Sequence, residues 1–145
     1  TIHAATDLLA EAKLSPELRN EALYYRAKAY TKQKADKKAM EDYRELAKDT
    51  RNPYGAEAKY QVAQSLYDAK EYAAAEKELL NYIEQSTPHA YWLARSFILL
   101  SDVYHATGKD LDARQYLLSL QQNYQGNDDI ESMIESRLSK LKVEN

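Results

Sequence analysis

Hydrophobic residues recur at steps of three and four along most of this 145-residue chain. This spacing places side chains on one face of an α-helix, and polar residues fill the remaining faces. Val and Ile, which favour strands, are sparse. The pattern therefore predicts an all-α protein. The clearest stripes are Leu23, Ala27 and Tyr30; Tyr72, Ala75, Leu79 and Ile83; and Ala113, Leu117 and Leu120.

The chain has three proline residues, and each follows a residue that can cap a helix. Proline fits the first position of a helix because its missing N–H would have no helical partner there. The three dipeptides therefore predict helix starts that are 37 and 35 residues apart. They are Ser15-Pro16, Asn52-Pro53 and Thr87-Pro88.

Small residues repeat with nearly the same interval. Two sets have spacings of 36 and 38 residues, and each member of the second set follows its partner by 12 residues across a short break. A small side chain lets two helices approach closely where they cross. Each period therefore predicts a helical hairpin, which must stack on its neighbours to cover its apolar surface. The sets are Ala27, Ala63 and Ser101, and Ala39, Ala75 and Ala113.

These periods predict eight helices in a single domain, residues 1–145. Residues 4–13 are interpreted as the second helix of an incomplete hairpin, because Ala5 precedes Ala39 by 34 residues. We therefore expect the parent array to continue upstream. Complete hairpins are predicted at 16–51, 52–86 and 87–125, followed by an amphipathic capping helix at 128–142. The stripe of that last helix is Ile130, Met133, Ile134, Leu138 and Leu141.

Composition narrows the class further. Only 3 Gly and 3 Pro interrupt the chain, which favours long helices and short connections. The net charge of −3 gives no global attraction to nucleic acid or to an anionic membrane. The absence of cysteine excludes disulfides and thiolate metal sites. No apolar run approaches the roughly 18–20 residues that cross a bilayer.

The hairpin pattern resembles the tetratricopeptide repeat. The closest segment, Ala63–Glu76, reads AQSLYDAKEYAAAE, and the third unit reads SDVYHATGKDLDAR. The resemblance implies an α-solenoid, a right-handed superhelix of antiparallel helix pairs, that acts as a protein–protein interaction scaffold. A structural cap or spacer in a longer array is the alternative function. The two differ in surface, because a scaffold needs a connected patch of Tyr, Arg and Lys and a spacer only scattered charge.

Two departures from the family pattern stand out. Lys34 and Lys70 occupy the turn position where the family commonly has glycine and where Gly108 stands in the third unit. Each lysine must adopt positive φ or reshape its turn. The joints around Asn52 and Thr87 are longer than usual, and in this they resemble bacterial cell-envelope members of the family. That likeness implies a bacterial periplasmic or envelope location.

Catalytic and metal-binding patterns are weak. His3, His89 and His105 are scattered without ligand spacing, so we expect no catalytic residue, metal, cofactor or small-molecule substrate. The Thr107–Asp110 segment lacks the upstream glycine and strand of a phosphate loop, and is interpreted as a helix–helix turn. The basic cluster at 32–38 contains no aromatic residue for base stacking, so a solvated turn explains it better than nucleic-acid binding.

Tyrosine is abundant, with 13 residues. Tyr30, Tyr43, Tyr72 and Tyr104 follow the predicted core stripes. In the family, first helices line the concave face, and this resemblance implies a partner-binding surface on the corresponding positions here. An ordinary solvated helix face is the alternative interpretation. The chaperone-tail clamp of the family is disfavoured, because Lys28 and Gln64 stand without its paired asparagines. The implied surface comprises Tyr24, Lys28, Lys32, Tyr60, Gln64, Tyr67, Arg95, Ile98, Asp102 and His105.

Overall fold

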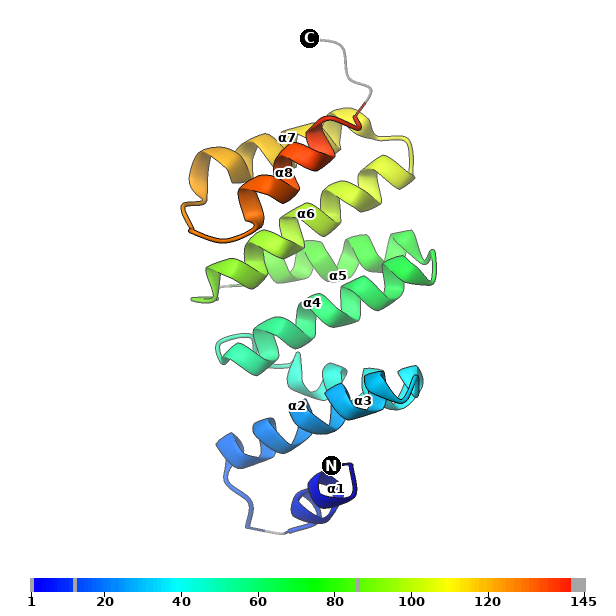
Figure 1. Ribbon diagram of the computed structural model, residues 1–145, viewed down its shortest axis with the longest axis vertical. Coiled ribbons are helices and arrows are strands. Elements are labelled where there is room, and N and C mark those ends of the chain that lie inside the picture. Colours follow the sequence, from blue (N-terminus) through cyan, green and yellow to red (C-terminus); the bar gives the residue numbers. More distant parts are fainter. Residues whose placement is uncertain (1, 12, 86, 142–145) are drawn as a thin grey trace. The chain divides into compact units, whose positions relative to one another are not determined.

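The computed structural model describes residues 2–11, 13–85 and 87–141. Across these residues the protein is all-α, with eight helices that pack sequentially and antiparallel (Figure 1). The predicted helix count is therefore confirmed for the described part of the chain. The helices are α1 (Ile2–Leu9), α2 (Pro16–Lys32), α3 (Asp36–Leu46), α4 (Pro53–Asp68), α5 (Tyr72–Glu84), α6 (Ala90–Ala106), α7 (Asp110–Asn123) and α8 (Ile130–Leu138).

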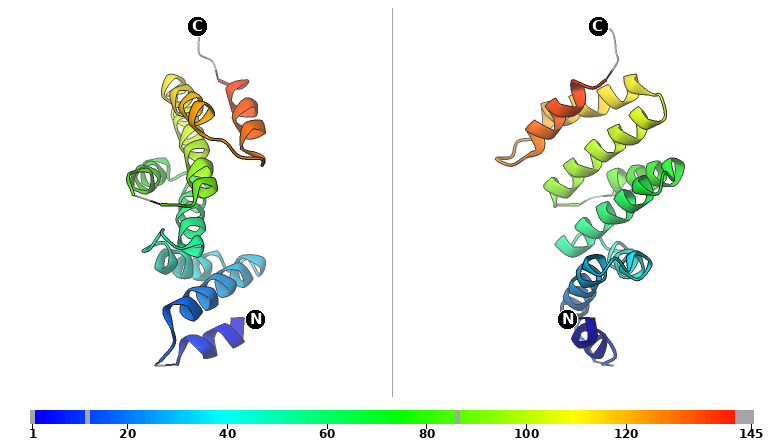
Figure 2. Two further views of the ribbon diagram at one scale, coloured as in Figure 1. Left: turned by 90° about the vertical axis from the view of Figure 1, so that its left-hand side faces the viewer. Right: turned by 45° about the vertical axis from the view of Figure 1, so that its right-hand side comes forward.

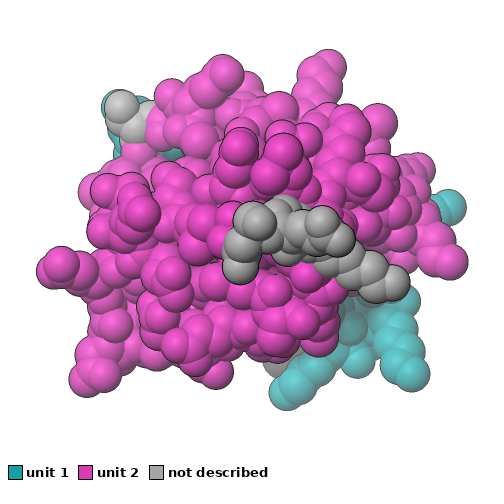
Figure 3. Space-filling view, turned by 90° about the horizontal axis from the view of Figure 1, so that it is seen from above, with its two compact units in different colours: residues 1–62 teal, residues 63–145 magenta. Residues whose placement is uncertain are grey.

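The chain divides into two compact units, residues 1–62 and 63–145, which Figure 3 colours separately. The division falls inside α4. In unit 1, α2 packs against both α1 and α3. In unit 2, α6 packs against α5, α7 and α8, and α8 also contacts α7. Figure 2 shows α6 and α7 side by side in both of its views. The helix at the centre of each group is therefore the first helix of a predicted hairpin.

Two of the three predicted helix starts are confirmed. α2 begins at Pro16, and the Ser15 hydroxyl oxygen accepts a hydrogen bond from the Leu18 N–H at 3.2 Å. α4 begins at Pro53, where Asn52 Oδ1 accepts from the Gly55 N–H at 2.8 Å. The third start is wrong by two residues.

In the third joint the proline belongs to a turn. Thr87 Oγ1 accepts from the His89 N–H at 3.3 Å, and the Pro88 carbonyl accepts from the Ala90 N–H at 3.2 Å. These bonds hold a short turn ahead of the helix, so α6 begins only at Ala90. Both terminal helices are also shorter than predicted: α1 ends at Leu9 and α8 at Leu138. Residues 12 and 142 of those predicted helices lie outside the described residues.

The three hairpin turns have the same backbone. Lys34 and Lys70 both have φ of 61°, and Gly108 has φ of 79°. The next residue in each turn donates its N–H to a carbonyl five residues back, on Tyr30, Leu66 or Tyr104, at 2.7–2.9 Å. In this pattern the helix ends at a residue with left-handed backbone conformation, and the N–H groups that follow donate to the last carbonyls of the helix. Lys34 and Lys70 therefore adopt positive φ, and neither reshapes its turn.

The recurring small residues all lie in the core. Their exposed fractions are 0% for Ala27 and Ala63, 1% for Ser101, 3% for Ala39, and 0% for Ala75 and Ala113. Ala74, one position before Ala75, is exposed. The predicted helix phase is therefore confirmed at these positions. Among the predicted core tyrosines, Tyr43 and Tyr104 are buried, whereas Tyr30 and Tyr72 are half-buried.

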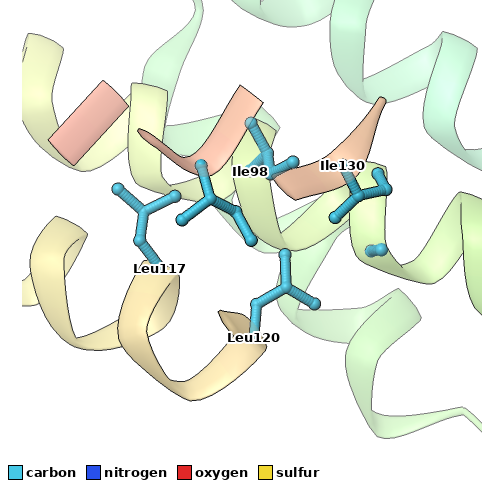
Figure 4. Close-up of a cluster of buried hydrophobic side chains, with 6 residues drawn as sticks. Ile98, Leu117, Leu120 and Ile130 are labelled. Carbon is cyan, nitrogen blue, oxygen red and sulfur yellow. The ribbon is translucent and has the colours of Figure 1, made fainter. Parts of the chain in front are cut away.

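One core cluster joins α6, α7 and α8. Figure 4 shows Ile98 of α6, Leu117 and Leu120 of α7 and Ile130 of α8 converging on one another. Met133, Leu138 and Leu141 pack around it. The predicted apolar stripe of the last helix therefore lies against the preceding hairpin. Burying these side chains stabilises the end of unit 2 by the usual ~25 cal/mol for each Å² of apolar surface removed from water.

Candidate functional site

The residues of the predicted binding surface differ widely in exposure. Lys28, Lys32 and His105 are exposed, whereas Tyr60 and Ile98 are buried, with exposed fractions of 6% and 1%. The assignment of Tyr60 and Ile98 to an open surface is therefore wrong. The half-buried members of the set are Tyr24, Gln64, Tyr67, Arg95 and Asp102.

Each of these two errors has its own structural cause. Every residue from Gly55 to Tyr60 is buried. Six consecutive helical residues cover the whole circumference, because each turns by about 100° from the last. This part of α4 therefore has no open face on which Tyr60 could lie. Ile98 belongs to the α6–α7–α8 cluster, since α8 covers a side of α6 that the hairpin pattern alone leaves open.

In unit 1, Tyr24 and Lys28 of α2 converge on Glu57 of α4. Tyr24 donates its hydroxyl to Glu57 Oε1 at 3.0 Å, and Lys28 Nζ lies 3.0 Å from Glu57 Oε2. Lys28 Nζ also lies 5.1 Å from the Tyr24 ring centroid. The exposed fraction of Glu57 is only 9%, so its carboxylate needs both partners. These two predicted contact residues therefore already hold α2 to α4.

The pKa values in this cluster reflect the same contacts. Partial burial lowers the pKa of the Lys28 ammonium, but its hydrogen bonds to Glu57 and Tyr24 outweigh that effect and raise the pKa overall. Burial raises the pKa of the Tyr24 hydroxyl, and the Glu57 carboxylate raises it further. Lys28 therefore remains a cation and Tyr24 a neutral donor throughout the physiological range. The cluster is a structural tie rather than a titrating site.

A shallow groove of about 530 Å³ lies beside this tie, also in unit 1. Lys32 contributes a cation to this groove, and the buried ring of Tyr43 contributes part of its apolar lining. Its only other cation is Lys28, which is already paired with Glu57. This groove therefore offers little for specific recognition. Its lining is Lys28, Ala29, Thr31, Lys32, Tyr43 and Gln61.

Arg95 lies in an aromatic cluster at the start of α6. Its Nη1 donates to the Tyr91 hydroxyl oxygen at 2.9 Å, and Cζ lies 5.8 and 5.9 Å from the ring centroids of Tyr91 and Trp92. Tyr91 in turn donates to Asp129 Oδ1, just before α8, at 3.0 Å. Arg95 therefore supports the junction of α6 with α8. The structure separates it from the other predicted contact residues of unit 2.

A groove of about 390 Å³ in unit 2 brings together four predicted residues, from the end of α4 and the second half of α6. Arg137 of α8 and two residues beyond that helix complete it. This groove is the candidate functional site. Its lining is Gln64, Tyr67, Ser101, Asp102, His105, Arg137, Lys140 and Leu141.

Asp102 and Arg137 form an ion pair within the lining of the groove. Arg137 Nε and Nη2 donate to the two carboxylate oxygens of Asp102 at 3.2 and 3.3 Å. A two-pronged bond of this kind fixes the plane of the guanidinium. It also anchors α8 to α6, so the groove keeps its shape. Lys140 forms no ion pair with any residue that the structure describes, which leaves one net positive charge between these three side chains.

Tyr67 and His105 add an aromatic ring and an imidazole to the lining of the groove. Tyr67 packs edge-on against Tyr72 with 5.6 Å between ring centroids, and burial raises the pKa of its hydroxyl, with a smaller contribution from Asp102. His105 Nδ1 lies 2.8 Å from Asp110 Oδ1, so the carboxylate orients the ring. Together these groups can form hydrogen bonds, an ion pair and aromatic contacts.

Sequence reasoning missed Arg137 and Lys140, because the last helix was interpreted only as a cap. One signal was present: the two cations are three residues apart within the predicted last helix, and that spacing places them on one face of it. Among the described residues, no cluster of three or more His, Asp or Glu side chains is arranged to hold a metal ion. In that same part of the chain, none of the helices combines the length and apolar character of a membrane span.

Comparison with protein family models, with curated proteins and with solved structures found no significant match for this chain.

Proposed function

We propose that the chain is a tetratricopeptide-like array, a right-handed superhelix of antiparallel helix pairs capped by α8, and that it serves as a protein–protein interaction scaffold. Two repeated features support the array. The same left-handed turn closes the first helix of each of three hairpins, at Lys34, Lys70 and Gly108. Small buried residues recur at two matched places in every hairpin. Such repeats depend on neighbour stacking.

The unit 2 groove is the observation that supports the scaffold function. It brings together the ring of Tyr67, the carboxylate of Asp102 and two cations, Arg137 and Lys140, in one connected hollow lined by α4, α6 and the C-terminal segment. Tyrosine and arginine are the side chains that most often dominate binding energy in protein interfaces. A spacer would carry only scattered charge, so the groove favours binding over a purely structural role.

The charges of the groove indicate the partner's chemistry. Arg137 is held by Asp102, while Lys140 has no carboxylate partner among the described residues. An acidic side chain of a partner could pair with Lys140 without breaking the Asp102–Arg137 bond. Tyr67 offers a ring against which an apolar neighbour of that acidic residue can pack. The scaffold therefore binds a short peptide segment that combines an acidic residue with an apolar one.

Selection from a library of random linear peptides on the immobilised chain tests this function. We expect enriched peptides to contain Asp or Glu beside an apolar residue. Reversing the charge at the groove in Lys140→Glu should weaken the best peptide by about fivefold, as loss of an exposed ion pair does. Its affinity should also fall as salt rises, because exposed charges are screened within about 8 Å at physiological ionic strength.

Lys77→Glu provides the matched control, because Lys77 is an exposed lysine of α5 outside the groove. It makes the same change of charge and should leave peptide affinity unchanged. Equal losses for both variants would show that net charge alone controls binding. Failure to enrich any peptide over an unrelated helical protein would contradict the scaffold function and favour the spacer.

A further inference from the structure

Among the described residues, His105 is the one histidine that lines the unit 2 groove. It lies in the last turn of α6, and its side chain has an exposed fraction of 46%. Nδ1 lies 2.8 Å from Oδ1 of Asp110, in the first turn of α7. A carboxylate only accepts hydrogen bonds, so Nδ1 carries the proton of the neutral ring. Nε2 is therefore the atom that gains or loses a proton as the pH changes.

The other charged groups that line the groove sum to one positive charge. Asp102 of α6 has both carboxylate oxygens bonded to Arg137 of α8, so these two charges cancel. Lys140 supplies the remaining charge, since it forms no ion pair with any described residue. On α4, Asp68 is bonded within its own helix, and burial raises the pKa of the Tyr67 hydroxyl, which therefore stays neutral.

The two remaining elements that pack on α6 place one carboxylate beside His105. It belongs to Asp110 of α7, which orients the ring. Lys109, just before α7, has its Nζ 5.9 Å from the ring centroid of Tyr104. Burial raises the pKa of the Tyr104 hydroxyl, and Glu76 of α5 raises it further. The charges of Lys109 and Glu76 therefore act on Tyr104, the residue next to His105.

Protonation of the imidazole would change the balance of charge in the groove. Histidine is the side chain that ordinarily changes charge between about pH 5 and 8. Carboxylates ordinarily release their protons below that range, and lysine, arginine and tyrosine release theirs above it. A proton on Nε2 of His105 therefore adds a second positive charge to the lining. It also converts Nε2 from an acceptor into a donor, which can bond a carboxylate.

We propose that His105 makes the affinity of this groove for an acidic peptide rise as the pH falls, by supplying a second cation in addition to Lys140. This inference rests on the proposed function, because it concerns the peptide that the groove binds. The carboxylates of such a peptide stay ionised down to about pH 5.5, since they protonate near pH 4. The favoured partner segment therefore carries two acidic residues, one for each cation.

The library-selected peptide, capped at both termini, serves as the probe in fluorescence polarisation with the full chain. We expect its affinity to rise by about fivefold between about pH 8 and pH 5.5, as gain of one exposed ion pair allows. His105→Gln should keep the affinity found at the higher pH and lose the increase, because an amide carries no charge. His105→Lys should bind at the higher pH as the unchanged chain binds at the lower.

His3→Gln is the matched control, because His3 also lies beside a carboxylate. Its Nε2 is 3.5 Å from Oδ2 of Asp7, in α1 of unit 1 and outside the groove. This variant removes a titrating imidazole of the same kind, and it should leave the pH profile of binding unchanged. A loss of the pH dependence in His3→Gln would assign the effect to the wrong histidine and overturn the proposal.

Proton uptake gives a second readout. Calorimetry at about pH 6.5 in two buffers of different ionisation enthalpy measures the protons that the complex takes up. We expect a fraction of one proton for the unchanged chain and none for His105→Gln, because linkage acts equally in both directions. A flat affinity profile, or an equal rise in His105→Gln, overturns this inference and leaves the proposed function standing. A selection that enriches no peptide contradicts both.

Discussion

At the scale of single residues, two lysines hold backbone conformations that lysine disfavours. Lys34 and Lys70 have φ of 61°, and their positions match Gly108 in the third hairpin. The left-handed region costs a residue with a Cβ roughly 1–2 kcal/mol, whereas glycine adopts it without that cost. The first two turns therefore carry a strain that the third avoids.

Replacing Lys70 with glycine should stabilise the protein. Relief of the left-handed strain outweighs the roughly 0.5–1 kcal/mol of extra backbone entropy that glycine loses on folding, so the net gain is up to about 1 kcal/mol. The urea unfolding midpoint measures it. Gly108→Ala should shift the midpoint in the opposite direction, although nothing lies within 4 Å of the added Cβ. A lower midpoint for Lys70→Gly would contradict the argument.

Ala75 and its neighbour Ala74 test the packing of α5 at the same scale. Ala75 has an exposed fraction of 0%, whereas Ala74 is exposed. Ala75→Leu should overpack the core and destabilise the fold by about 1–3 kcal/mol. Ala74→Leu should remain within about 0.5 kcal/mol of the unchanged chain, as surface changes usually do. Equal shifts of the two unfolding midpoints would contradict the helix phase.

At the scale of helices, a buried ion pair joins α2 to α3. Arg26 donates through Nε and Nη2 to the two carboxylate oxygens of Asp42 at 2.7 and 2.6 Å. Their side chains have exposed fractions of 19% and 5%. Arg26 Nη1 also donates to Thr6 of α1 at 3.2 Å, so one guanidinium holds three helices of unit 1. Its hydrogen bonds to Asp42 raise the pKa of Arg26 above its ordinary value.

Arg26→Met should destabilise the protein by about 3 kcal/mol, because it leaves the Asp42 carboxylate buried without a counter-ion. Urea unfolding followed by circular dichroism measures the loss. Arg19→Met is the comparison, since Arg19 lies 3.8 Å from Glu45 with both side chains at least 40% exposed. That pair should contribute less than about 1 kcal/mol. A similar loss for both variants would show that burial does not set the cost.

The sequence predicted those parts of the fold that depend on local signals. Ser15 and Asn52 cap the helices that follow them, and the repeated small residues are all buried. Errors arose where a neighbour from elsewhere in the chain decided the outcome. Ile98 is buried because α8 returns to cover α6, and Tyr60 because the whole circumference of α4 is covered there. Such tertiary contacts leave no trace in the spacing of a single helix.

The candidate site was predicted only in part for the same reason. Gln64, Tyr67, Asp102 and His105 share one groove, as their positions on first helices implied. Arg137 joins them through its bond to Asp102, 35 residues away in sequence. Tyr24 and Lys28 have the expected chemistry, but an internal partner, Glu57, already uses it. Whether a polar side chain is available for binding depends on such partners, which no residue spacing reveals.

At the scale of the whole molecule, the chain forms two compact units, residues 1–62 and 63–145. The candidate groove of Tyr67 and Arg137 belongs to the second unit. Each unit has its own ion pair between helices, Arg26 with Asp42 in the first and Arg137 with Asp102 in the second. Because the groove takes its whole lining from the second unit, its peptide affinity should not depend on the ion pair of the first.

Measuring the library-selected peptide against variants of both units tests this expectation. Arg26→Met should leave the peptide affinity unchanged under conditions in which the variant is folded, whereas Lys140→Glu should weaken it by about fivefold. The double variant should show the Lys140→Glu loss alone, because sites without a coupling free energy respond additively. If Arg26→Met changes the affinity, a coupling between the units exists, and peptide binding must then change the stability of the first unit in return.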